Sequence, residues 1–157
     1  NGTGSTKAPK KDTSLKQGTK VTDKKSKVVY KVNGNKTVEY NKVNKKAKTA
    51  TVPTTVKVNG VNYQVTAIAP KAFANNKNLK KVVIPVSVRS IGKQAFSGCK
   101  NLKTIIINTP YLTKKSVGAK AFKGIHAKAT IKVPKKQKKA YQKFLKSKGI
   151  GKKVKIK

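Results

Sequence analysis

The segments IAPKAFANNKNLKKVVIP (residues 68–85) and IGKQAFSGCKNLKTIIIN (residues 91–108) are two copies of one pattern, offset by 23 residues. A third copy follows at an offset of 26, and its three extra residues fall in the loop 108–118. TVP at residues 51–53 is a partial earlier echo of VIP at 83–85 and KVP at 132–134. The positions that align are Ile68, Ile91 and Val117; Phe73, Phe96 and Phe122; Leu79 and Leu102; Val82, Ile105 and Ile131; and Ile84, Ile107 and Val133.

A period of 20 to 29 residues with the spacing L-x-x-V-x-I indicates a leucine-rich solenoid, in which each copy supplies one short strand and a return segment. One copy cannot bury its apolar side alone, so stacking places the Phe, the Leu and the strand aliphatics of every copy in one continuous interior. The predicted fold is mainly β with short helices. It is a short leucine-rich-repeat solenoid of about three repeats of 23–26 residues, capped by N-terminal β-hairpins and a C-terminal helix.

Four segments are expected along the chain. Residues 1–26, made mostly of small polar residues and lysine, predict a flexible basic linker, or alternatively a polybasic tether to an anionic wall or membrane. Residues 27–64 predict a cap of two hairpins that turn at Asn33-Gly34 and Asn59-Gly60, because both residues of an Asn-Gly pair accept positive φ. Residues 65–133 contain the repeats.

The fourth segment, residues 134–157, predicts a capping helix and a short strand. Pro134 suits a first helical turn, and Gly149 can end the helix in the left-handed conformation. The final VKIK is expected to add the strand, and the helix to act as a lid over the open end of the last repeat. The apolar stripe of the helix consists of Ala140, Tyr141, Phe144 and Leu145.

The charge balance limits the chemistry. Lysine and arginine total 40 against three carboxylates, giving a net charge of +37, and the acids are Asp12, Asp23 and Glu39. From Tyr40 onward the chain therefore lacks the acids of general acid–base pairs, glycosidases, Ser-His-Asp triads and calcium loops. With one cysteine and one histidine, no disulfide within the chain and no zinc spacing exists. We expect no enzymatic activity, no metal and no cofactor.

No apolar run reaches the length of a transmembrane helix, so membrane insertion is not expected. The chain begins with Asn1 and has no hydrophobic stretch near its start. A signal peptide, if there is one, has therefore been removed or left out.

The run Ile-x-x-x-Ala-Phe, then Cys or Asn, then Asn-Leu, then Val-x-Ile-Pro resembles the BspA-type leucine-rich repeat over roughly residues 50–135. The Ala-Phe-x-x-Cys-x-x-Leu motif at 95–102 is a fairly specific part of the pattern. The resemblance implies a β-solenoid-like stack in a bacterial cell-surface or secreted protein, and a role in adhesion or binding. The expected localisation is extracellular or at the cell surface.

The third copy departs from this pattern. Lys128 stands where the other copies have leucine, so we expect Ala127 or Ala129 to turn inward instead. Cys99 aligns with Asn76 and Ile125, a position expected to face the core, where a thiol packs as a small hydrophobe.

Two reactive alternatives involve Cys99 and Glu39. Cys99 with His126 would make a nucleophile and base pair, but no acid is available to orient the histidine. Glu39 is expected to pair with a lysine across its hairpin, and the alternative is a Lys-Asn isopeptide crosslink.

Strand alternation predicts a candidate binding face, because residues between inward-pointing aliphatics point outward. Val83 and Ile106, with Lys132 of the third copy, would form one ladder on this face, and Lys81, Thr104 and Thr130 a second. The alternative is that the β-branched residues only shield one another or lie under a hairpin.

Lysine clusters lie at KKAK (45–48), at KNLKK (77–81) and in the tail from Lys135 to Lys157. Without carboxylates, their charge can be neutralised only by salt or a polyanion. The predicted partners are anionic glycans, wall polymers, and host or extracellular proteins, bound by a monomeric, non-enzymatic module. Nucleic acid would bind only non-specifically, because Arg89 is the one arginine and lysine reads bases poorly. The alternative function is a structural spacer or anchor within a larger surface protein.

Overall fold

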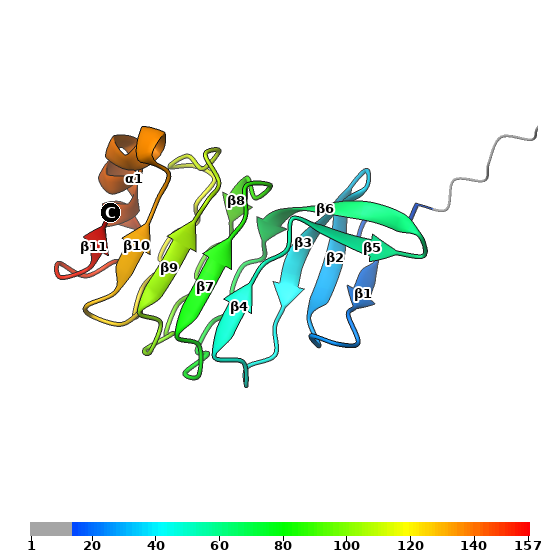
Figure 1. Cartoon of the computed structure of the whole chain (residues 1–157), viewed down its shortest axis with the longest axis horizontal. Helices are drawn as coiled ribbons and strands as arrows, with labels where there is room; N and C mark the ends of the chain where they lie inside the picture. The colour runs from blue at the N-terminus through cyan, green and yellow to red at the C-terminus, as the bar shows by residue number, and fades with distance from the viewer. Residues whose placement is uncertain (1–13) are drawn as a thin grey trace, which may run out of the picture.

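A computed structural model describes residues 14–157, and residues 1–13 of the predicted linker lie outside the described residues. The alternating aliphatic runs form strands that belong to two sheets (Figure 1). The strands are β1 (Lys20–Thr22), β2 (Val29–Gly34), β3 (Thr37–Lys42), β4 (Thr49–Thr51), β5 (Thr55–Val58), β6 (Val61–Ile68), β7 (Lys81–Ile84), β8 (Ser90–Ile91), β9 (Thr104–Ile107), β10 (Thr130–Lys132) and β11 (Lys155–Ile156).

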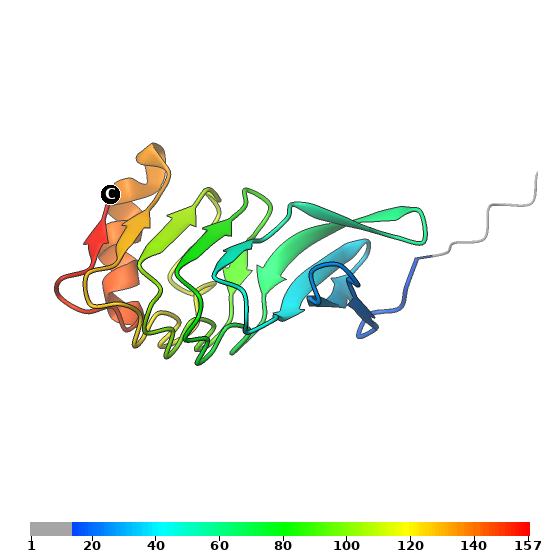
Figure 2. The same ribbon diagram turned by 60° about the horizontal axis from the view of Figure 1, so that its bottom comes forward.

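The repeat strands form a five-stranded sheet in the order β11-β10-β9-β7-β4, and every neighbouring pair in it is parallel. Its register reproduces the offsets found in the sequence, because Val82 pairs with Ile105 and Ile105 with Ile131. The partial echo at 51–53 marks the end of β4, so this sheet has two strands beyond the three full copies. Figure 2 shows the turns of successive windings stacked in a row along one edge.

The repeat phenylalanines stack face to face through the interior. The ring centroids of Phe73 and Phe96 are 4.8 Å apart and those of Phe96 and Phe122 are 5.4 Å apart, with interplanar angles of 15° and 3°. Tyr40 extends the stack at 5.5 Å from Phe73. Backbone hydrogen bonds follow the same spine, since the Phe73 N–H donates to Ala95 O and the Phe96 N–H donates to Ala121 O, each at 2.8 Å. The predicted register of the repeats is confirmed.

In the third copy an alanine enters the core in place of the leucine of the other two copies. Ala129 is fully buried, whereas Ala127 and Lys128 are exposed. Of the two expected alternatives, Ala129 is therefore the residue that turns inward.

Adjacent windings come into close backbone contact at two glycines in equivalent positions. A Cβ on Gly92 would overlap the backbone of Pro70, and a Cβ on Gly118 would overlap the backbone of Lys93. Only glycine fits here, because a backbone obstacle cannot move aside as a side chain can.

The N-terminal part differs from the sequence-based expectation. Within the segment predicted as a linker, β1 pairs antiparallel with β2, and the Leu15 N–H donates to the Tyr63 hydroxyl at 2.8 Å. An edge strand gains backbone hydrogen bonds without needing many apolar residues. The polar composition of this segment therefore did not reveal the strand. The predicted cap at 27–64 also merges with the repeats, since β4 belongs to the five-stranded sheet and β6 continues to Ile68.

The first predicted turn is wrong by two residues. The chain turns at Asn35-Lys36, where Lys36 has φ 54°, and Asn33 lies at a bulge in β2. The Asn33 side chain accepts a hydrogen bond from Thr37 Oγ1 at 2.6 Å and donates to Thr66 Oγ1 at 3.2 Å, which holds it in the sheet. The second prediction is confirmed, because Asn59 and Gly60 have φ of 50° and 79°.

The six-stranded sheet has the order β1-β2-β3-β6-β5, with β8 beside β6. The pair of β3 with β6 and the pair of β6 with β8 are parallel, and Ile91 bridges in parallel to Val117. This sheet therefore runs from the N-terminal hairpins onto the second side of the solenoid.

The C-terminal segment forms the 3-10 helix η2 (Lys135–Gln137), the helix α1 (Lys138–Leu145) and the 3-10 helix η3 (Lys146–Lys148). Gly149 ends it with φ 93°, as expected. Tyr141 and Leu145 are buried, Phe144 is half-buried and Ala140 is exposed, so the predicted stripe is wrong at Ala140.

The helical segment caps the last repeat at the C-terminal end of the solenoid, as expected (Figure 1). The Phe122 N–H donates to Lys148 O at 3.0 Å, which continues the hydrogen-bonded spine, and β11 adds to the five-stranded sheet. The helical segment and β11 therefore cover the third repeat as the two sides of one further winding.

Candidate functional site

The predicted binding face exists as two ladders on the outer side of the five-stranded sheet. In the first ladder Val83 pairs with Ile106 and Ile106 with Lys132. In the second ladder Lys81 pairs with Thr104 and Thr104 with Thr130. The alternation of burial along β7 and β9 places these side chains opposite the core.

The ladders are partly covered. Val83 and Ile106 are half-buried, while Lys81 and Lys132 are exposed. Neighbouring β-branched side chains shield one another in such an arrangement, so the aliphatic centre of the face offers limited contact area. The two exposed lysines stand at opposite ends of the predicted site, and its role in ligand binding stays a prediction.

At one end of this face the structure forms a hollow of about 350 Å³, which we call the lysine hollow. It is lined by Thr130, Lys132, Val133, Lys135, Lys138 and Lys157. Thus β10, η2, the start of α1 and the residue after β11 meet there. The sequence placed Thr130 and Lys132 at the site and marked the tail from Lys135 to Lys157 as a lysine cluster, but it did not show that the two lie together.

Backbone hydrogen bonds hold the hollow together. The Lys157 N–H donates to Ile131 O at 2.9 Å, and the Val133 N–H donates to Lys157 O at 2.9 Å. These bonds fix Lys157 beside β10, so four lysines from two separate stretches of chain, 130–138 and the residue after β11, line the hollow.

No side-chain carboxylate follows Glu39 in the sequence, so the lysines of this hollow have no side-chain counter-ion from the repeats or the helix. At physiological ionic strength the Debye length is about 8 Å, so ammonium groups that share one hollow still act together on an anion. Lysine ammoniums bind as compact point charges and impose little geometry. The hollow can therefore hold sulfate, phosphate or carboxylate groups of a polymer.

A second concave region, the tyrosine cleft, lies where the loops after β7 and β9 meet the second hairpin. Its volume is about 380 Å³, and its lining consists of Thr54, Gln64, Val86, Ser87, Arg89, Asn108, Pro110 and Tyr111. The guanidinium carbon of Arg89 lies 4.2 Å from the centre of the Tyr111 ring. The sequence did not predict this cleft, although the lengthened loop and the one arginine, Arg89, were signals of it.

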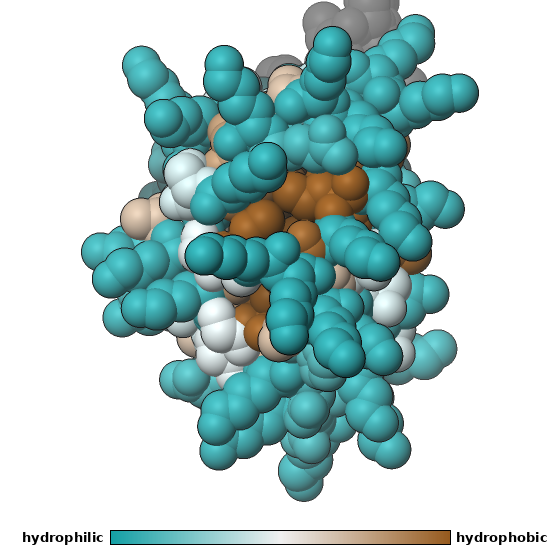
Figure 3. All heavy atoms as spheres, turned by 90° about the vertical axis from the view of Figure 1, so that its left-hand side faces the viewer, coloured by the Kyte–Doolittle hydropathy of each residue, from teal (hydrophilic) through white to brown (hydrophobic). Residues whose placement is uncertain are grey.

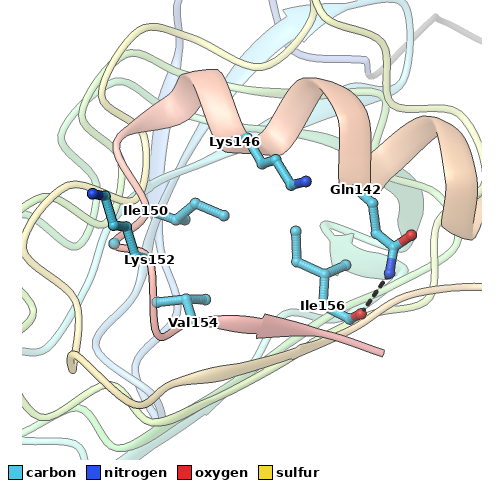
Figure 4. A pocket seen from close by; sticks show the side chains of 7 residues that line it. Gln142, Lys146, Ile150, Lys152, Val154 and Ile156 are labelled. Carbon is cyan, nitrogen blue, oxygen red and sulfur yellow. Dashed lines mark hydrogen bonds between the residues drawn. The ribbon is translucent and has the colours of Figure 1, made fainter.

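A third hollow, the end hollow, opens at the C-terminal end of the stack and has a volume of about 520 Å³. Half-buried Ile150, Val154 and Ile156 form its floor, and Lys146 and Lys152 stand at its margin (Figure 4). Gln142 Nε2 donates to Ile156 O at 2.9 Å across it. Figure 3 looks onto this end and shows apolar residues surrounded by hydrophilic side chains.

The two residues weighed as a catalytic pair have other roles. The thiol of Cys99 is fully buried and donates to Phe73 O at 3.0 Å, and burial raises its pKa to about 11. A thiol that stays protonated is a poor nucleophile. His126 Nδ1 accepts a hydrogen bond from the Lys128 N–H at 3.0 Å, so it caps a local turn. Cys99 packs in the core, as expected.

Glu39 accepts a hydrogen bond from Asn41 Nδ2 at 2.7 Å, and Lys31 is its register partner on β2. Among residues 14–157, no group of three or more His, Cys, Asp or Glu is arranged to hold a metal ion. Within the same described range, no helix has the length and apolar character needed to cross a membrane.

The comparison with protein families gives one match. A model described as the BspA type leucine rich repeat region matches residues 48–156 in 6 copies. The match extends past residue 135 and so includes the C-terminal helix and β11. No curated protein is significantly similar to this chain.

Solved structures share the fold. A leucine rich cell surface protein from Faecalibacterium prausnitzii is 25% identical with a TM-score of 0.61, over 76% of this chain and 38% of that one. This chain thus spans well under half the length of that protein. A leucine-rich repeat protein from Bacteroides capillosus is 18% identical with a TM-score of 0.56, over 88% of this chain and 98% of that one.

Proposed function

Because the chain belongs to the BspA-type leucine-rich repeat family, we propose that it is a non-enzymatic binding module of the bacterial cell surface that engages polyanions through the lysine hollow. The similarity to a cell surface protein supports the location. The observation that carries the proposal is the meeting of Lys132, Lys135, Lys138 and Lys157 in one hollow of a chain without nearby side-chain carboxylates.

The ligand class follows from the charge. Sulfated or carboxylated glycans and phosphate-bearing wall polymers repeat their charges along a chain, so one polymer can fill the hollow and continue along the exposed lysines of the sheet face. Nucleic acid would bind by the same attraction, with little sequence preference, since lysine lacks the bidentate fork that reads bases.

The test compares the wild type with a variant in which the four hollow lysines are replaced by glutamine. Binding to heparin and to lipoteichoic acid is measured against salt concentration. Counterion release lowers log K by about 0.7–0.9 per contacted anion for each tenfold rise in salt, so the slope should fall by about 3 in the variant.

A matched control replaces four exposed lysines of the N-terminal part, namely Lys16, Lys20, Lys46 and Lys57, with glutamine. It has the same net charge as the first variant and should keep nearly the wild-type slope. If both variants lose the same slope, binding follows net charge alone and the lysine hollow has no special role.

The second candidate, a spacer or anchor within a longer surface protein, is favoured by the partial coverage of the Faecalibacterium protein. A spacer needs no ligand. Failure of the wild type to bind heparin or lipoteichoic acid at about 0.1 M salt, where screening is still moderate, would favour it over the binding module.

A further inference from the structure

We propose that the tyrosine cleft binds the carboxylate-bearing sugar residue of an acidic glycan, with Arg89 holding the carboxylate and with Tyr111 and Val86 contacting the ring. This goes beyond the charge-driven binding above, because it depends on the shape of one cleft and the fork of one guanidinium. The two proposals can therefore fail separately.

The cleft is held in place by one buried threonine. Thr109 is fully buried, and its Oγ1 donates to Val88 O at 2.5 Å and accepts from the Tyr111 N–H at 3.2 Å. The residue before Arg89 and the backbone of Tyr111 are thus tied to the same hydroxyl. The Tyr141 hydroxyl of α1 in turn donates to Thr109 O at 2.7 Å.

The opposite loop is fixed as well. Ser87 Oγ donates to Val65 O at 2.6 Å, and the Arg89 N–H donates to Thr66 O at 2.8 Å. A site whose backbone is already ordered loses little entropy when a ligand arrives. This order also gives the three extra residues of the third repeat a role, since they lie in the loop that presents Tyr111.

Arg89 is prepared to bind a planar anion. Its guanidinium carbon lies over the Tyr111 ring, 4.2 Å from the ring centre, in a cation–π contact. A guanidinium donates two parallel hydrogen bonds to a carboxylate, whereas an ammonium cannot. The side-chain carboxylates of the described residues are Asp23 and Glu39, and both are hydrogen-bonded in the N-terminal part of the chain. An external carboxylate is the partner that fits.

The cleft also exposes apolar surface that the core does not use. Val86 and Tyr111 are 54% and 49% exposed, the highest among the large hydrophobic residues that the structure describes. Gln64 and Asn108 are exposed in the same lining. Flat apolar contacts beside a few amide groups suit a pyranose ring, whose C–H face is apolar and whose edge carries hydroxyls.

These features favour an acidic sugar over an acidic peptide. A peptide carboxylate needs only a cation, and the lysine hollow supplies four of them. A sugar ring uses the aromatic contact, the aliphatic contact and the amides together. Both uronic and sialic acids combine such a ring with a carboxylate.

The test is a titration of the ¹⁵N-labelled chain with D-glucuronic acid and N-acetylneuraminic acid, observed by NMR. Salt at about 0.3 M suppresses the exposed lysines, whose attraction is screened. We expect saturable shifts around Val86, Arg89 and Tyr111 with at least one of the two acids. D-glucose and N-acetylglutamate should each bind at least tenfold more weakly.

Two variants separate the contributions. Arg89→Lys keeps the charge but removes the two-pronged guanidinium, and Tyr111→Ala removes the aromatic ring. Each should weaken binding of the acidic sugar at least tenfold, while the other NMR resonances show that the chain is still folded. Lys57→Gln, on the exposed second hairpin, should leave it unchanged. Retention of Arg89→Lys on heparin should equal that of the wild type.

The proposal is overturned if neither acid shifts the cleft, if glucose or N-acetylglutamate binds as tightly, or if Arg89→Lys binds the acidic sugar normally. If the wild type fails to bind heparin but still binds glucuronate or sialate, the proposal for the lysine hollow is wrong and the proposal for the tyrosine cleft is supported.

Discussion

Replacing Phe96 with alanine tests the stacked interior most directly. The Phe96 ring is fully buried and lies between Phe73 at 4.8 Å and Phe122 at 5.4 Å. Replacing a buried phenylalanine with alanine lowers the free energy of unfolding by about 3–5 kcal/mol in protein cores. The loss of two stacked contacts favours the upper half of that range. We expect a loss of about 4–5 kcal/mol in the free energy of unfolding.

A matched control is Phe144→Ala. Phe144 is half-buried and makes one edge contact, with Tyr141 at 5.3 Å. Its removal should cost about 1–2 kcal/mol, since exposed surface contributes little and no closed cavity forms. Phe96→Leu keeps most of the volume and should also cost about 1–2 kcal/mol, largely from the lost stacking.

Urea unfolding followed by far-UV circular dichroism measures these differences, because the chain has no tryptophan for fluorescence. Marginal stability of about 5–15 kcal/mol means that the Phe96→Ala chain should unfold at much lower urea or be unfolded in water. If Phe96→Ala lowers the free energy of unfolding no more than Phe144→Ala does, the repeats do not share one continuous core. The inference from their aligned phenylalanines would then be wrong.

Two further changes test the packing of the windings. Gly92→Ala should destabilise by about 2–3 kcal/mol or more, because its Cβ would overlap the backbone of Pro70. Gly151→Ala should change stability by less than about 0.5 kcal/mol, since its Cβ meets nothing within 4 Å, and equal effects in urea would contradict the close approach. For Cys99, burial raises the thiol pKa from 9.0 to about 11, so above pH 9 the unfolded chain loses the thiol proton before the folded chain does. Stability should therefore fall between pH 9 and pH 11, and Cys99→Ala should make this fall shallower in urea titrations, whereas an unchanged slope would refute the buried thiol's contribution.

The repeat itself was readable from the sequence because it depends on local chemistry copied along the chain. The Ala-Phe pairs and the alternating aliphatics fix which side chains enter the core, so the stacking of Phe73, Phe96 and Phe122 followed from alignment. The same register predicted that Ala127 or Ala129 turns inward in place of Lys128, and the structure shows that it is Ala129.

The N-terminal errors arose where long-range contacts decide the structure. The Asn33-Gly34 pair has the composition of a tight turn, yet a hydrogen bond from Asn33 to Thr66 holds Asn33 in the sheet. Likewise β1 is a strand because β2 offers it an edge, and its own sequence contains little to signal this.

The candidate site divides in the same way. The two ladders were predicted, since strand alternation and the repeat offset determine them. The lysine hollow requires Lys157 to return beside β10, and the tyrosine cleft requires a loop conformation tied to α1 through Thr109. Such meetings depend on tertiary structure, so no spacing in the sequence reveals them.

The end hollow affects whether molecules of this protein associate with one another. A solenoid end normally has a polar outer surface for solubility, whereas this one sets an aliphatic floor inside a cationic margin. When two such ends meet, their aliphatic floors attract each other through the hydrophobic effect, and their cationic margins repel each other. The range of that opposition shrinks from about 10 Å at 0.1 M salt to about 3 Å at 1 M, so a concentrated solution should stay monodisperse in dilute buffer and pair end to end in brine.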